Sequence, residues 1–106
     1  MLTEAGRADE GLPLARRAAA LAPDNPFVLD TLGWALQQKG QSKEAREALQ
    51  KAAAQRPEAP SVLYHLAVSC QAVGDRQAAK ESLEKALALS KDFPEATAAR
   101  KLLSSL

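Results

Sequence analysis

The chain has 106 residues, and its 14 basic and 13 acidic side chains leave a net charge of only +1. A net charge this close to zero gives no sign of the basic surface typical of nucleic-acid-binding proteins. No apolar run approaches the roughly 20 residues that span a membrane. Alanine (23 copies) and leucine (16 copies) are the commonest residues and isoleucine is absent, which favours helices over sheets and predicts an all-α protein.

A period of 34 residues runs through the chain. Glycine recurs at positions 6, 40 and 74, and proline recurs at positions 26, 60 and 94. When residues 26–57 are aligned with residues 60–91 without gaps, 12 of the 32 positions are identical. Repeats of this length are typical of stacked helix pairs, so we expect an α-α superhelix, or solenoid, of antiparallel pairs.

Six helices are predicted in chain order. Prolines that suit a first helical turn stand at positions 26 and 60, and glycines that tolerate a left-handed turn end the same helices. Good N-cap residues stand at the starts of three of the later helices: Asn25, Ser42 and Asp75. Pro13 falls inside the first helical pattern, close enough to its start to predict a mild kink. The expected helices are about 9–22, 26–39, 42–55, 60–73, 76–90 and 94–105.

Apolar residues at helical spacing predict the buried side of each helix. The first helix of each pair carries large side chains, and the second carries many alanines, which let two helix backbones approach closely. The predicted packing residues are Leu29, Leu32, Leu36, Ala45, Leu49 and Ala52 in one unit, and Leu63, Leu66, Cys70, Ala79, Leu83 and Ala86 in the next.

These units resemble the tetratricopeptide repeat (TPR) family, whose pattern is W-x₂-L-G-x₂-Y, then A-x₃-F, then A and P. Here the pattern reads Leu29-x₂-Leu32-Gly33-x₂-Leu36, Ala45-x₃-Leu49, Ala52 and Pro57. The segments LDTLGWAL, YHLA and KDFPEATAARKLL are also similar to the C-terminal end of bacterial TPR lipoproteins linked to exopolysaccharide secretion and surface-protein sorting.

The repeat register divides the chain. Residues 1–25 are interpreted as a partial repeat, because Gly6 is expected to end a helix as Gly40 does one period later. Residues 26–59 and 60–93 form whole repeats. We therefore expect a single TPR domain that is a fragment of a longer array.

The two ends are expected to differ. The sequence pattern of residues 94–106, with apolar residues on one side and charged residues on the other, predicts a capping helix. At the other end, Leu12, Leu14 and Leu21 are expected to pack onto the following helix pair and leave their upstream side uncovered. This truncated N-terminal face could support weak homo-oligomerisation.

The family resemblance implies that a partner protein or peptide binds in the concave groove formed by the first helices of successive units. The corresponding groove residues are Phe27, Asp30, Trp34, Gln37, Ser61, Tyr64, Val68 and Gln71. Aromatic residues there suit a docked peptide or helix, although Trp34 and Tyr64 could instead fill space between adjacent helices. Phe27 could instead pack against the preceding turn.

Some family members clamp a C-terminal carboxylate with basic and amide side chains. The same face here presents Asp30, Trp34, Tyr64, Val68 and Glu95, without a basic pair, so a carboxylate clamp is not expected. An extended, apolar or weakly basic segment suits this face better.

Two functions remain open from the sequence. The first is a protein–protein interaction module that docks a partner segment in its groove. The second is a structural end segment that stabilises or assembles a longer scaffold. A helix-turn-helix nucleic-acid binder is disfavoured by the balanced charge and the regular period.

Catalytic and metal-site chemistry is not expected. No nucleophile–base pair, glycine-rich phosphate loop or metal-ligand spacing occurs, so we predict no enzyme, no cofactor and no metal. Cys70 on the packing side is expected to be a buried thiol, and His65 a hydrogen-bonded or solvated side chain. The segment MLTEAGRADEG does not read as a signal peptide, which leaves the location, cytoplasmic or periplasmic, open.

Overall fold

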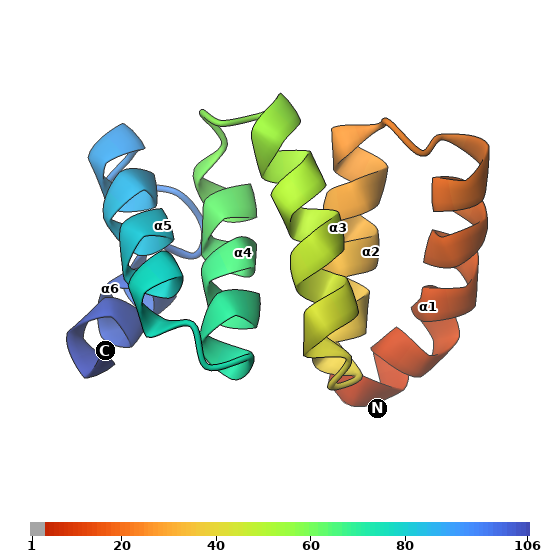
Figure 1. Ribbon diagram of the computed structural model, residues 1–106, viewed down its shortest axis with the longest axis horizontal. Helices are drawn as coiled ribbons and strands as arrows, with labels where there is room; N and C mark the ends of the chain where they lie inside the picture. The colour runs from red at the N-terminus through yellow and green to blue at the C-terminus, as the bar shows by residue number, and fades with distance from the viewer. Residues whose placement is uncertain (1–3) are drawn as a thin grey trace.

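The computed structural model describes the backbone of residues 4–106 and the side chains of residues 11–106. Over that range the chain forms six α-helices and no strand. The helices stand in a row, and each runs antiparallel to the one before it (Figure 1). This arrangement confirms the predicted all-α, TPR-type helical repeat. The helices are α1 (Glu4–Leu21), α2 (Pro26–Gln38), α3 (Ser42–Gln55), α4 (Pro60–Ala72), α5 (Arg76–Leu89) and α6 (Ala96–Ser105).

The turns after α2 and α4 are built alike. Gly40 and Gly74 have φ angles of +81° and +88°, a left-handed conformation that glycine adopts without steric cost. One residue later, the Gln41 and Asp75 backbone N–H groups donate to carbonyls in the preceding helix at the same distance, 2.9 Å. The predicted glycine turns are therefore confirmed.

Side-chain caps form at two helix starts. The Asn25 side chain accepts from the backbone N–H groups of Phe27 and Val28 at 2.9 and 3.3 Å. Asp75 accepts from the backbone N–H of Ala78 at 3.1 Å. The expectation that Ser42 caps α3 is wrong, because Ser42 is the first residue of that helix and the preceding residue makes no side-chain cap.

The core consists of three apolar clusters placed one after another along the row. Residues of α1, α2 and α3 meet in the first cluster, and Leu29, Ala52 and Val62 join the α2–α3 pair to α4 in the second. The largest cluster unites α4, α5 and α6 around the fully buried Leu83. The core is therefore shared between successive neighbouring helices, as expected for a solenoid.

Close helix contact in the α2–α3 pair depends on a glycine. A Cβ atom built on Gly33 would lie 2.4 Å from the Cγ atom of Leu49, a side chain with no exposed surface. Small buried residues serve the same purpose elsewhere, since Ala45, Ala52 and Ala67 are each 0% exposed. The predicted role of small residues in helix packing is confirmed.

The N-terminal helix departs from the sequence prediction in three ways. It begins at Glu4 instead of residue 9, and it continues through Gly6, which the repeat register had placed at a helix end. The mild kink predicted at Pro13, by contrast, agrees with Figure 1, where the first turns of α1 stand at an angle to the remainder. Leu14 and Leu21 do not pack onto the following pair, since they are 65% and 88% exposed.

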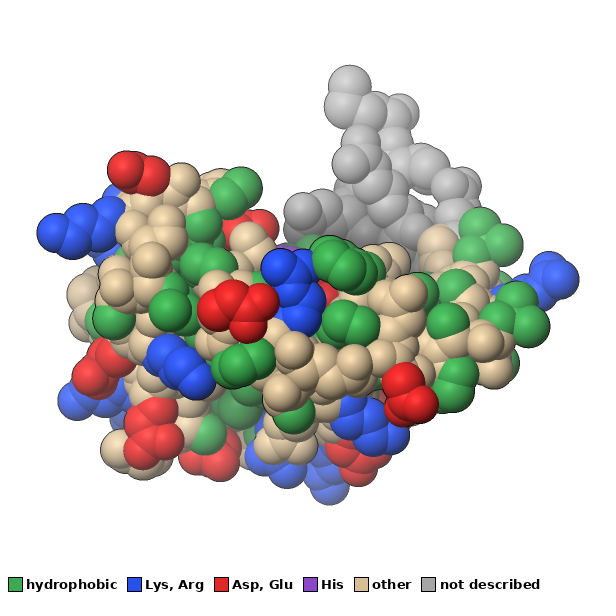
Figure 2. Space-filling view, turned by 90° about the horizontal axis from the view of Figure 1, so that it is seen from above, with side chains coloured by type: hydrophobic (Ala, Val, Ile, Leu, Met, Phe, Trp, Pro, Cys, Tyr) green, Lys and Arg blue, Asp and Glu red, His purple; other side chains and the backbone are tan. Residues whose placement is uncertain are grey.

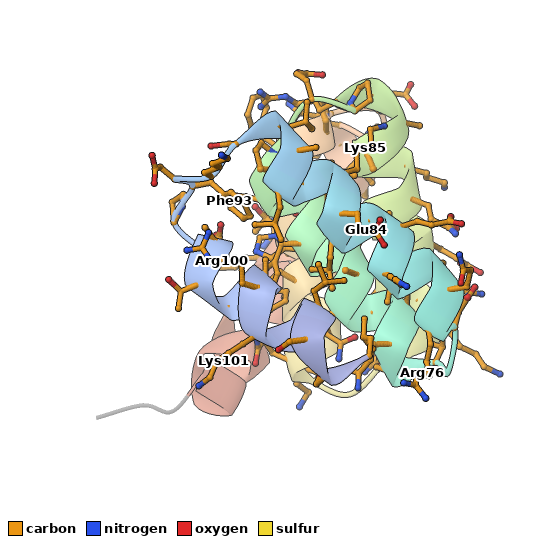
Figure 3. The ribbon with its side chains drawn as sticks, turned by 90° about the vertical axis from the view of Figure 1, so that its left-hand side faces the viewer. Arg76, Glu84, Lys85, Phe93, Arg100 and Lys101 are labelled. Atoms are coloured by element: carbon orange, nitrogen blue, oxygen red, sulfur yellow. The ribbon has the colours of Figure 1, made fainter. Side chains whose placement is uncertain are left out.

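The C-terminal helix α6 packs one side against the α4–α5 cluster. Phe93, Ala96 and Ala99 are buried there, whereas Arg100 and Lys101 are exposed. Figure 3 shows Phe93 in the segment between α5 and α6, with both basic residues on the outer side of α6. The helix begins two residues later than predicted, because Pro94 and Glu95 belong to the preceding turn.

Candidate functional site on the inner face of α2 and α4

Polar and aromatic side chains from three parts of the chain meet beside the packed core. Asp30 and Trp34 come from α2, and Ser61, Tyr64 and His65 come from α4. Glu95, just before α6, completes the group. We call this surface, formed by these six residues, the inner face.

His65 is the central residue of the inner face. Its Nδ1 atom lies 2.8 Å from Oδ1 of Asp30, and its Nε2 atom lies 3.9 Å from Oε1 of Glu95. The imidazole also stacks on the Trp34 indole, with the ring centroids 4.3 Å apart and an interplanar angle of 27°. A single side chain thus links α2, α4 and the start of α6.

The aromatic rings form a continuous group across α2 and α4. Trp34 and Tyr64 have ring centroids 6.2 Å apart and are tilted by 47°, a favourable arrangement for aromatic pairs. Tyr64 also packs against the core cluster of α4, α5 and α6. These rings therefore fill the space between neighbouring helices, and the partly exposed Trp34 also contributes surface.

Glu95 is held by a hydrogen bond that follows the repeat. The Ser61 hydroxyl donates to Oε2 of Glu95 at 2.7 Å, and these residues are one period of 34 apart. Asp30 and Glu95 keep side-chain exposed fractions of 23% and 28%, against 13% for His65. Both carboxylates are therefore positioned by neighbours yet still reach the surface.

The helices that carry the inner face contribute acidic but no basic lysine or arginine side chains. Helices α2 and α4 contain no lysine or arginine, and Asp30 is the only acidic residue in either. The face seen from above in Figure 2 is mixed, because blue basic and red acidic side chains are interspersed there with hydrophobic ones. The inner face therefore has a negative character that the balanced net charge conceals.

The predicted groove residues do not all join this group. Phe27 is 65% exposed and lies apart from the inner-face rings, with the Arg56 guanidinium 4.6 Å from its ring centroid. Gln37 and Val68 are half-buried, and Gln71 is exposed. The contacts described above unite only Asp30, Trp34, Ser61 and Tyr64 of the predicted set.

Sequence reasoning missed the importance of His65 and its link to Glu95. His65 is hydrogen-bonded, as expected, but its hydrogen-bond partner Asp30 is 35 residues away in the chain, and Glu95, 3.9 Å from its Nε2 atom, is 30 residues away. The repeat register aligns Asp30 with Tyr64 and Thr31 with His65, so the register alone gives no signal that His65 contacts Asp30.

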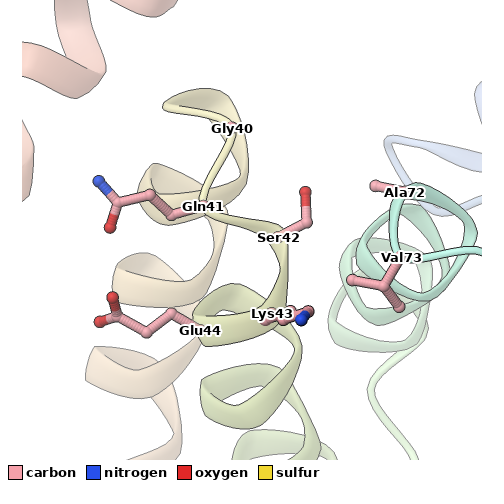
Figure 4. Close-up of a pocket in the computed structure, with 7 residues that line it drawn as sticks. All are labelled: Gly40, Gln41, Ser42, Lys43, Glu44, Ala72 and Val73. Atoms are coloured by element: carbon pink, nitrogen blue, oxygen red, sulfur yellow. The ribbon is translucent and has the colours of Figure 1, made fainter.

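Two surface hollows lie away from the inner face. One lies beside the turn between α2 and α3, where Gly40–Glu44 faces Ala72 and Val73 (Figure 4). There, Gln41 and Glu44 point away from α4, and both bond to Arg16 at 3.2 and 2.9 Å. The second hollow, between α3 and α5, is lined by Gln50, Ala53, Ala54, Pro57, Leu63, Leu66, Glu81, Ser82 and Lys85.

The single cysteine is a packing residue. Cys70 is 2% exposed within the α4–α5–α6 cluster. Burial raises the pKa of its thiol, and the nearby Asp75 carboxylate raises it further, while Arg46 acts in the opposite direction. The buried thiol predicted from sequence is confirmed, and its raised pKa disfavours the reactive thiolate.

Within the part of the chain that the structure describes, no group of three or more histidine, cysteine or acidic side chains could hold a metal ion. Over the same residues, none of the helices combines the length and apolar character needed to cross a bilayer.

Comparisons with known proteins agree with this architecture. A tetratricopeptide repeat profile matches residues 2–69, and a second one matches residues 60–93. The chain belongs to the tetratricopeptide repeat family. Membership of this family supports a role in protein–protein interaction. A comparison with curated protein sequences finds no match.

Among solved structures, the TPR chain is similar to SycD, the type III secretion translocator chaperone of Yersinia enterocolitica, crystallised as an alternative dimer. The TM-score is 0.81 at 20% sequence identity, and the match covers 96% of this chain and 80% of SycD. This likeness shows a shared helical fold.

Proposed function

We propose that this TPR domain is an interaction module that docks a segment of a partner protein on its inner face. The observation that carries the proposal is the ring group of Trp34, Tyr64 and His65, which spans two helices beside partly exposed carboxylates. Aromatic side chains supply large contact areas at little entropic cost, and they dominate binding energies at interfaces.

The rigidity of the inner face supports the same function. Hydrogen bonds from His65 and Ser61 hold Asp30 and Glu95, and ring stacking holds Trp34. A surface already fixed before binding loses little conformational entropy when a ligand docks. A partner that docks on the inner face therefore immobilises fewer side chains than one that binds to mobile surface residues.

The experiment uses a library of random 12-residue peptides displayed on phage and selected with the purified domain. Replacing Trp34 by alanine should weaken the selected peptides by about 30-fold, because removing an interface tryptophan costs about 2 kcal/mol. Leu89→Ala is the matched control, since Leu89 is a 45% exposed apolar residue on α5. Circular dichroism establishes that both variants are folded.

Equal affinity of the selected peptides for wild type and Trp34→Ala would contradict docking on the inner face. A loss in Leu89→Ala alone would place the binding surface on α5.

A second candidate function is self-assembly through α1. Leu14 and Leu21 are 65% and 88% exposed and seven residues apart, so they lie on one side of the helix, two turns apart. Exposed leucines on one helix side are typical of an association surface. Sedimentation at rising concentration tests this candidate: wild type should self-associate and Leu14→Ser/Leu21→Ser should stay monomeric, whereas a monomeric wild type contradicts it.

A further inference from the structure

We propose that the inner face selects partner segments by a cationic side chain, a lysine or arginine flanked by apolar residues. The cation would approach the exposed edges of the Asp30 and Glu95 carboxylates while the flanking residues pack on Trp34. This inference rests on the proposed function and adds the chemical class of the partner.

The distribution of charge supports a cationic ligand. The chain has 14 lysines and arginines, yet α2 and α4 contain none. Among the described residues, the ion pairs of lysine and arginine involve other carboxylates, such as Glu44, Glu58 and Asp75. Among the residues whose side chains the structure describes, no lysine or arginine is paired with Asp30 or Glu95.

The carboxylates are held in place yet retain acceptor capacity. Oδ1 of Asp30 is bonded to His65, and Oε2 of Glu95 accepts from Ser61. A carboxylate offers about four lone-pair sites, so these contacts do not exhaust its capacity. Because both groups are about three-quarters buried, their attraction for a cation is less screened than at an open surface.

Aromatic rings add a second means of recognising a cation. The face of an indole or phenol ring attracts a guanidinium or ammonium group within about 6 Å. The chain itself shows this contact on α2, where the Arg56 guanidinium lies 4.6 Å from the Phe27 ring centroid. Trp34, two turns further along α2, stacks on His65, which in turn is bonded to the Asp30 carboxylate, so a partly exposed ring and a carboxylate belong to one group.

The test reads the composition of the peptides selected by wild-type domain from the random 12-residue phage library. We expect lysine or arginine to be enriched at one position beside apolar residues. Replacing that residue by glutamine in a synthetic copy should weaken binding about tenfold, the combined effect of two partly exposed ion pairs. Raising the salt concentration should weaken the original peptide more than its glutamine copy.

Charge is then removed from the domain without removing hydrogen-bond acceptors. In Asp30→Asn/Glu95→Gln, the amide oxygens can still accept from His65 and Ser61, so the inner face keeps its shape. We expect about tenfold weaker binding of the cationic peptide and little change for its glutamine copy. Glu47→Gln/Glu84→Gln is the matched control with the same net charge, since both residues are exposed on α3 and α5.

Failure of this inference is distinguishable from failure of the proposed function. Two outcomes overturn the cationic preference alone. In the first, the selected peptides require Trp34 but are neutral or acidic. In the second, they bind the inner-face and control double variants equally. If no peptide is selected, or if the selected peptides bind Trp34→Ala as well as wild type, both the docking function and the cationic preference are overturned.

Discussion

Helices α2 and α4 each have two sides with different chemistry. The packing side carries Leu29 and Leu36 on α2 and Leu63 and Cys70 on α4, each at most 5% exposed. The inner face carries a histidine, carboxylates and rings that still reach the surface. The packing side recurs with the 34-residue period, whereas the inner face differs between repeats. If the proposed function is correct, the packing side supplies stability and the inner face supplies recognition.

The largest expected effect comes from a cavity on the packing side. Leu83→Ala removes a side chain with no exposed surface from the α4–α5–α6 cluster and should lower the free energy of unfolding by about 2–5 kcal/mol. Urea denaturation followed by circular dichroism measures the change. The control is Leu89→Ala on the same helix, which should cost much less because Leu89 is 45% exposed; equal losses would contradict the assigned packing side.

The next effect tests the close approach of α2 and α3. Gly33→Ala places a Cβ atom 2.4 Å from the Leu49 Cγ atom, and overpacking outweighs the better helix propensity of alanine. We expect a loss of about 1–2 kcal/mol in unfolding free energy by urea denaturation. Gly11→Ala is the control, because a Cβ atom at Gly11 meets nothing within 4 Å, and it should be neutral or stabilising. A stabilised Gly33→Ala would contradict the close approach.

The smallest effect compares the starts of the two helices. Asn25→Ala removes the side-chain cap of α2 and should cost about 1 kcal/mol in unfolding free energy. Ala59, one period later, occupies the N-cap position of α4 and makes no side-chain cap, so Ala59→Asn should be stabilising by a similar amount. Thermal unfolding of both variants makes the comparison. Opposite signs are expected, and a destabilised Ala59→Asn would show that the two helix starts are not equivalent.

Much of the fold could be predicted because local signals agree with the repeat. The glycines at 40 and 74 sit where only a left-handed turn fits, and prolines begin α2 and α4. The same reasoning was wrong at Gly6, since a glycine can also lie within a helix at a cost of about 1 kcal/mol. Helix formers on both sides of Gly6, such as Ala5 and Arg7, favour that continuation.

The candidate site was predicted less completely. Its aromatic residues could be placed from the repeat register, because Trp34 and Tyr64 fall on helix positions away from the leucines. The contacts of His65 depend on how neighbouring repeats are offset, which one repeat considered alone does not contain. The pairing of His65 with Asp30 at 2.8 Å is a property of the α2–α4 contact.

The central claim is that partner segments dock on the inner face. The most direct test is a titration of ¹⁵N-labelled domain with the tightest selected peptide, followed by NMR chemical shifts. The claim predicts the largest changes at Asp30, Tyr64 and His65 and at the Trp34 indole N–H. Largest changes at Gln50, Ala54 and Lys85, which line the hollow between α3 and α5, with an unchanged Trp34 indole signal, would contradict it.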